Sequence, residues 1–113
     1  MTLIYAYKNR GITRDITIQD AAGNAITPGV NDKVRVQIGR EGGTPLLSVT
    51  SGTPTAAGSS VTKGSKNRVR LDASDLAFAP GVYSLEVDYW DNADAQEWKV
   101  VELQTFFLEE GIP

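Results

Sequence analysis

The feature that most constrains this chain is the alternation of apolar and polar residues in short runs. The clearest run spans residues 33–38, where Val34, Val36 and Ile38 alternate with polar side chains. A period of two is typical of a β-strand with one face in a core, because successive side chains point to opposite faces. Further runs of this kind are separated by segments rich in glycine, proline and asparagine, which favour turns. The sequence therefore predicts an all-β fold.

Strands are predicted for much of the chain. They are expected at residues 3–7, 12–19, 33–38, 46–49, 68–71, 82–90 and 97–107. A short helix of one or two turns is expected after Asp72, which can cap its first turn, and it ends before Pro80 and Gly81. About seven short strands separated by turns are typical of a β-sandwich. We therefore expect an Ig-like antiparallel β-sandwich with one short helix, forming a single domain over residues 1–113.

Two segments do not follow the alternation. Residues 51–60 are small and polar without a period, which predicts a mobile surface loop. In residues 97–107 the apolar Val100 and Val101 are adjacent, so the phase breaks. One interpretation is a strand apolar on both faces, with two sets: Val101, Leu103, Thr105 and Phe107 toward the core, and Trp98, Val100 and Phe106 outward. The alternative is a β-bulge that turns Trp98 inward.

The chain contains no cysteine and no histidine. This excludes disulfides, thiolate catalysis, thiolate zinc sites and histidine as a proton shuttle or metal ligand. Carboxylates cluster around one predicted hairpin turn, at Asp88, Asp91, Asp94 and Glu97. They lack the glycine and the spacing of a helix-loop-helix calcium site, so we expect them to be solvated. The sequence therefore predicts no catalytic residue, no metal site and no cofactor, and a protein that is not an enzyme.

Charge is divided unevenly along the chain. Residues 1–70 carry ten basic and four acidic side chains, whereas residues 71–113 carry one basic and ten acidic side chains. In one interpretation, strands from the two halves lie side by side and their charges pair within the fold. In the other, the basic side of one copy meets the acidic side of its neighbour. No apolar run is long enough to span a membrane and no secretory signal is evident, so we expect synthesis in the cytoplasm and no membrane partner.

Two groups of residues are candidates for contact with other molecules. Trp90 and Trp98 flank the predicted hairpin turn, and exposed aromatic patches often mark interfaces. The basic residues near position 68 have no aromatic side chain among them on which bases could stack, so we expect no nucleic acid partner. The candidate interaction residues are Trp90, Trp98, Val100, Phe106, Arg68 and Arg70. Alternatively, the two tryptophans could stack on sugar rings in a carbohydrate-binding or host-attachment module.

The order of several motifs resembles the N-terminal β-sandwich domain of phage baseplate proteins of the BppU type. The turn at residues 20–26 is similar to the D-A-x-G-x-x-[IV] element of that family, and it follows strand-like residues 4–8 and 16–18. Residues 70–75 and 80–83 are similar to its short helix and its P-G-x-Y strand entry. Residues 104–109 are similar to its final G-x-F-x-[VL] strand, with Gln104 where the family often has glycine.

This resemblance implies a bacteriophage virion structural protein. Such a protein would lie in the tail, baseplate or neck, or on the capsid, as an adaptor that contacts other virion proteins and forms a homo-oligomer. It would be made in the host cytoplasm and end in the virion. The family offers no catalytic residues to transfer to this chain.

Overall fold

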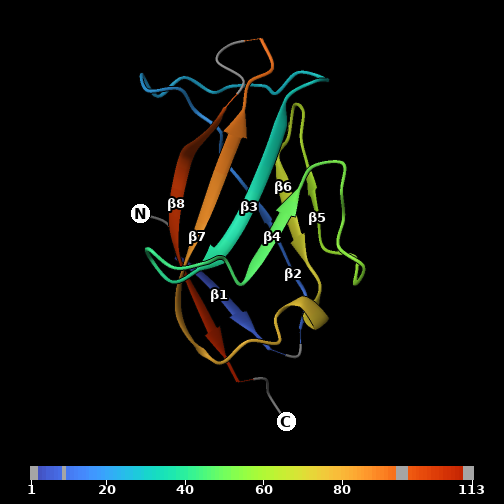
Figure 1. Ribbon diagram of the computed structural model, residues 1–113, viewed down its shortest axis with the longest axis vertical. Helices are drawn as coiled ribbons and strands as arrows, with labels where there is room; N and C mark the ends of the chain where they lie inside the picture. Colours follow the sequence, from blue (N-terminus) through green and yellow to red (C-terminus); the bar gives the residue numbers. More distant parts are fainter. Residues whose placement is uncertain (1–2, 9, 94–96, 111–113) are drawn as a thin grey trace.

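Two β-sheets pack face to face in the computed structural model, which describes residues 3–8, 10–93 and 97–110 (Figure 1). The strands are β1 (Leu3–Tyr7), β2 (Ile12–Asp15), β3 (Lys33–Gly39), β4 (Leu47–Thr50), β5 (Ser60–Thr62), β6 (Arg68–Leu71), β7 (Gly81–Trp90) and β8 (Trp98–Glu109). One sheet has the order β1-β8-β7-β3-β4 and the other has the order β2-β6-β5. The predicted all-β sandwich is confirmed.

The core lies between the two sheets and is built by the predicted alternation. In β3, Val34, Val36 and Ile38 are buried while the residues between them are half-buried or exposed. In β7, the inward positions 83, 85, 87 and 89 are all buried. The smaller sheet contributes Val61 and Val69, among others, to the same core. A period of two therefore gives each sheet one inner and one outer face.

The first strand is paired in a direction that the sequence did not indicate. β1 lies parallel to β8, with Leu3 opposite Thr105 and Tyr7 opposite Glu109. The expectation of a purely antiparallel sandwich is therefore wrong for this pair. The two strands lie near opposite ends of the sequence, so no short hairpin turn forces them to be antiparallel.

A β-bulge sets the phase of β8. Val87 pairs with Glu102 but Asp88 pairs with Val100, so Val101 is the extra residue. Beyond the bulge Phe106 points into the core and is fully buried, whereas Leu103 is 53% exposed. The expectation that Leu103 faces the core and Phe106 faces outward is therefore wrong. The bulge turns Phe106 inward, and not Trp98 as the alternative interpretation supposed.

Residues 51–60 hold more structure than the predicted mobile loop. Ser60 begins β5, a strand of three residues that the alternation did not reveal. Ser59 is fully buried, and its hydroxyl donates to Asp75 Oδ2. Thr55 Oγ1 donates to the same Asp75 oxygen at 2.5 Å. The segment is thus tied to η1 (Ala73–Asp75), a three-residue 3-10 helix that occupies the place of the predicted short helix.

Asp72 caps η1 as the sequence predicted. Its Oδ2 accepts a hydrogen bond from Ser74 N at 3.0 Å, which satisfies one free donor at the start of the turn. The backbone amide of Asp72 also donates to Ser59 Oγ at 2.7 Å. The cap therefore connects the turn with the buried end of the 51–60 segment.

Candidate interaction surface

An apolar surface lies on the outer side of the five-stranded sheet. We call it the apolar face and define it by side chains that are 50–56% exposed: Leu3, Tyr5, Val82, Val100 and Leu103. These residues come from the neighbouring strands β1, β8 and β7. Each strand has buried residues next to them, such as Ile4, which point to the opposite side of the sheet. The apolar face therefore does not belong to the core.

The strand register brings part of the apolar face into one row. Tyr5 lies opposite Phe107, and Phe107 lies opposite Val82. The rings of Tyr5 and Phe107 are stacked, with centroids 4.8 Å apart and planes 11° apart. Leu103 lies further along β8 on the same side, beside Glu86 of β7. Rigid, exposed aromatic and aliphatic groups of this kind are typical of protein interfaces.

The two tryptophans lie opposite each other near the end of the β7–β8 hairpin, and both are half-buried. The ammonium group of Lys33 lies over the Trp90 ring at 4.7 Å, and the guanidinium group of Arg35 lies over the Trp98 ring at 4.1 Å. Cations over aromatic rings are attracted by the negative face of the ring. Stacking on a sugar needs an open ring face, and here a cation already covers one face of each tryptophan.

A charged cluster lies on β3 and β7 beside Val100 and Leu103 of the apolar face. Arg35 Nε on β3 forms a 2.9 Å ion pair with Asp88 Oδ2 on β7, and Asp88 is only 1% exposed. With its amide assigned from the hydrogen-bond network, Gln37 donates to Asp88 Oδ2 and to Glu86 Oε2, both at 3.2 Å. Basic β3 therefore lies beside acidic β7, and this ion pair follows the interpretation that charges from the two halves pair within the fold.

Glu86 is the group whose protonation state this cluster controls. A hydrogen bond with Asp88, then burial and the negative charge of Asp88, raise the pKa of Glu86 to about 7, while Arg35 acts in the opposite direction. Glu86 lies close to Asp88, whose carboxylate pairs with Arg35, so keeping both carboxylates ionised is unfavourable. The charge at the centre of this outer sheet surface therefore changes near neutral pH.

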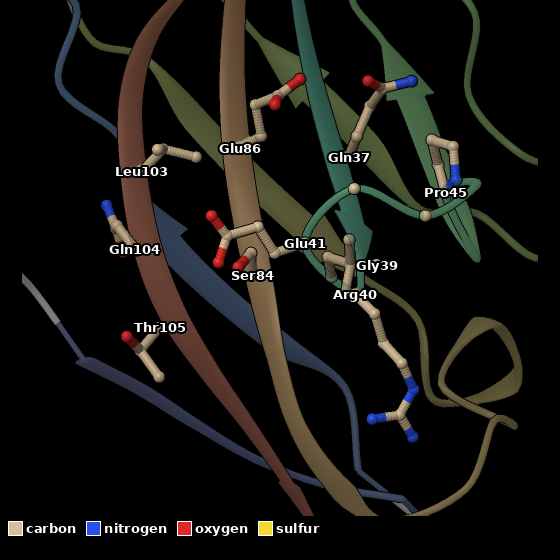
Figure 2. Close-up of a pocket in the computed structure, with 13 residues that line it drawn as sticks. Gln37, Gly39, Arg40, Glu41, Pro45, Ser84, Glu86, Leu103, Gln104 and Thr105 are labelled. Carbon is tan, nitrogen blue, oxygen red and sulfur yellow. The ribbon is translucent and has the colours of Figure 1, made fainter.

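A shallow hollow of about 700 Å³ adjoins the apolar face (Figure 2). The loop between β3 and β4 overhangs β7, and Figure 2 shows Glu41 reaching from it above Ser84. Glu86, Leu103 and other β7 and β8 residues line the remaining sides. Because Leu103 belongs to both features, a molecule that covers the apolar face would also reach this hollow.

The structure separates the candidate residues inferred from the sequence. Trp90, Trp98 and Val100 lie on the outer side of the five-stranded sheet, whereas Phe106 is in the core. The remaining two candidates, Arg68 and Arg70, lie on β6 in the other sheet and are exposed.

Both arginines on β6 have partners within the chain. Arg68 Nε forms a 2.9 Å ion pair with Asp15 Oδ1 on the neighbouring strand β2. Arg70 donates to the carbonyl oxygen of Gly58 at 2.8 Å, and its guanidinium group lies 3.6 Å from Asp72 Oδ1. Through these contacts the two arginines connect β6 with β2 and with the segments next to β5 and η1.

Four residues of the apolar face were missed as candidates from the sequence: Leu3, Tyr5, Val82 and Leu103. The signal was present in residues 3–7, where both alternating sets are apolar or aromatic, so one set must face away from the core. Leu103 was assigned to the core because the bulge was not located.

The carboxylates near the β7–β8 turn are only partly described, because Asp94 lies outside the described residues. Among the described residues, no group of three or more acidic side chains is placed to hold a metal ion.

Comparison with protein-family models and with curated proteins identifies no relative. No protein-family model matches this sequence, and no curated protein matches it either. Across the residues that the structure describes, no helix has the length and apolar character needed to cross a membrane. The β-sandwich and its apolar face are therefore the observations on which a function can be proposed.

Proposed function

We propose that this protein is a non-enzymatic structural component that acts by contact with other proteins through the apolar face. The carrying observation is that Leu3, Tyr5, Val82, Val100 and Leu103 are each about half exposed and all lie on the outer side of one sheet. Soluble domains seldom expose a large apolar patch without a use, and such patches often mark binding sites for proteins.

The surroundings of the apolar face support a protein partner. Half-buried aromatic residues lie at its border, and the Arg35–Asp88 ion pair offers polar groups beside it. Protein interfaces typically combine an apolar centre with aromatic and arginine side chains and a polar rim. The row formed by Tyr5, Phe107 and Val82 is largely apolar, so a partner that covers it would remove few polar groups from water.

The setting that we propose is a bacteriophage virion, in the tail, baseplate or neck or on the capsid. This part of the proposal is supported by the resemblance of the sequence motifs to the BppU-type family. In that setting the protein would be an adaptor between virion proteins, made in the host cytoplasm.

The test compares a variant of the apolar face with a matched variant of the other sheet. Val100→Asp with Leu103→Asp places two charges on the apolar face, and both native side chains are more than half exposed. Thr13→Asp with Thr62→Asp places two charges on exposed positions of β2 and β5. Each tagged protein is used to recover partners from cells that produce the virion, and the recovered proteins are identified by mass spectrometry.

We expect the wild type and the Thr13/Thr62 variant to recover the same virion proteins. The Val100/Leu103 variant should lose them while keeping the circular dichroism spectrum of the wild type. If the variant of the apolar face recovers those proteins as well as the wild type does, the apolar face is not the contact surface. If the proteins recovered are not virion components, the proposed setting is wrong.

A further inference from the structure

The sandwich has four strands at the edges of its two sheets, and they differ in how well they are protected. Edge strands of natural proteins usually carry charges or proline, because their free backbone groups can pair with another chain. In the smaller sheet, β2 contains Arg14 and Asp15, and β5 has only three residues. In the larger sheet, β1 (Leu3–Tyr7) has five residues with no charge, no proline and no glycine. β1 is therefore the least protected edge among the described strands.

The pairing of β1 with β8 decides which backbone amides and carbonyls of β1 face the open side of the sheet. Lys8 N donates to Glu109 O at 3.0 Å, which continues the parallel ladder beyond the end of the strand. Backbone groups of a strand alternate in direction, so residues 4, 6 and 8 bond toward β8. The amides and carbonyls of Leu3 and Tyr5 therefore point to the open side, as does the amide of Tyr7.

The opposite edge of the same sheet offers fewer free groups. β4 (Leu47–Thr50) has four residues, and the carbonyl of Thr50 already accepts a hydrogen bond from Thr53 N at 3.0 Å. Thr50 also forms an isolated antiparallel bridge with Thr53, which folds the following chain back against this edge. Pairing with another chain is thus favoured at β1 over β4.

We propose that a second copy of this chain pairs with β1, antiparallel, about a twofold axis at Tyr5. This proposal rests on the proposed function, a role in contact with other proteins. It deepens that function by naming one partner, a second copy of the chain. In this register Tyr5 lies opposite Tyr5 of the second copy, and Leu3 lies opposite its Tyr7. The two five-stranded sheets then form one continuous sheet, and each copy contributes the same strand, as a twofold interface requires.

The side chains of β1 suit this pairing. The strand carries no charge, so no like charges are placed opposite each other across the axis. Tyr5 is 50% exposed and its ring is already held by the stack on Phe107, so little side-chain freedom is lost on pairing. A five-residue strand pair is small beside the roughly 1,200–2,000 Å² that stable interfaces bury. The dimer should therefore be weak in isolation and should depend on protein concentration.

The test is sedimentation equilibrium of the purified protein over a wide range of concentration, with two matched variants. Tyr5→Lys places two like charges at the axis, and Leu3→Lys is a second variant in case Tyr5→Lys disturbs the stack on Phe107. Ser48→Lys is the control, because it adds the same charge to an exposed position at the opposite edge of the same sheet. Hydrogen exchange of the wild type, followed amide by amide, reports the pairing without any substitution.

We expect a monomer–dimer equilibrium that either β1 variant weakens at least tenfold and Ser48→Lys leaves unchanged. The amides of Tyr5 and Tyr7 should exchange more slowly as concentration rises, while the amide of Ser48 should not. A wild type that stays monomeric at high concentration, a dimer that survives in folded Leu3→Lys, or a dimer whose Tyr5 amide stays unprotected would overturn the proposal. None of these results bears on the recovery of partners through Val100 and Leu103, so the two proposals can fail separately.

Discussion

The side chains of β8 show how one residue decides which groups stabilise the fold and which face outward. Val101 is the extra residue of the bulge, and every residue after it changes face. Phe106 therefore fills the core, while Leu103 and Phe107 face outward with Tyr5 and Val82. Alternation in the sequence predicts which face of the sheet a side chain occupies only as far as the next bulge.

This reversal leads to a direct stability prediction. Phe106→Ala should lower the free energy of unfolding by about 3–5 kcal/mol, because it removes a fully buried ring and leaves a cavity. Leu103→Ala, only three residues away, should change it by about 0.5 kcal/mol or less, because its side chain is half exposed. Urea denaturation of both variants measures the difference. A larger loss of stability for Leu103→Ala than for Phe106→Ala would mean that β8 has the opposite phase.

A second prediction concerns the pH dependence of stability. The pKa of Glu86 is about 7 in the fold against an ordinary 4.5, so the folded state binds the proton more tightly than the unfolded chain. This contribution is fully present below pH 4.5 and is lost as the pH rises through 7. Each unit of pKa difference corresponds to about 1.4 kcal/mol. Glu86 is only partly buried, so solvent screening reduces the effect, and we expect a total loss on the order of 1–3 kcal/mol.

The matching variant is Glu86→Gln, which keeps the shape of the side chain and cannot ionise. Its free energy of unfolding should stay nearly constant between pH 5 and pH 8, whereas that of the wild type should fall. Asp20, Asp32 and Asp72 have lowered pKa values, so their stabilising contributions are lost at lower pH and do not enter this window. A wild-type stability that rises from pH 5 to pH 8 would contradict the assignment to Glu86.

At the scale of elements, alternation predicted every described strand except the shortest, β5. β3 and β7 carry regular alternation over seven and ten residues, so their inward faces could be identified from the sequence. β5 has three residues inside a polar segment, too few to show a period. The stability of this segment comes from partners distant in sequence, above all the carboxylate of Asp75.

The anchoring of the 51–60 segment can be tested at Asp75. Asp75→Ala removes the acceptor shared by the hydroxyls of Thr55 and Ser59, of which Ser59 is fully buried. A buried donor without its acceptor costs about 1–3 kcal/mol, so unfolding should become easier by that amount. Hydrogen exchange in the 51–60 segment should also become faster. Ser65→Ala, at an exposed position between β5 and β6, is the control and should change neither quantity.

At the scale of the whole molecule, the two sheets share a single core. Buried residues of the smaller sheet, such as Val61 and Leu71, belong to the same cluster as Ile38 and Phe106 of the larger sheet. A sheet of three short strands has little stability without a partner to cover its inner face. The two sheets should therefore fold and unfold together.

This predicts one cooperative unfolding transition. Tryptophan fluorescence reports only on the β7–β8 hairpin, because the chain has two tryptophans and both lie there. Far-ultraviolet circular dichroism reports on the strands of both sheets. In a two-state transition, the two signals should give the same midpoint and the same slope against urea. Loss of circular dichroism before the fluorescence changes would mean that the smaller sheet unfolds first.

The sequence by itself determined the all-β class, the inward faces of β3 and β7, the cap of the short turn and the exclusion of cysteine and histidine chemistry. These features depend on local spacing and composition, which the chain carries at every point. The tertiary structure decided the parallel pairing of β1 with β8, the bulge at Val101 and the position of the apolar face. Each depends on contacts between strands far apart in the sequence, and a strand that is apolar on both faces gives no local signal of which face its neighbours will cover.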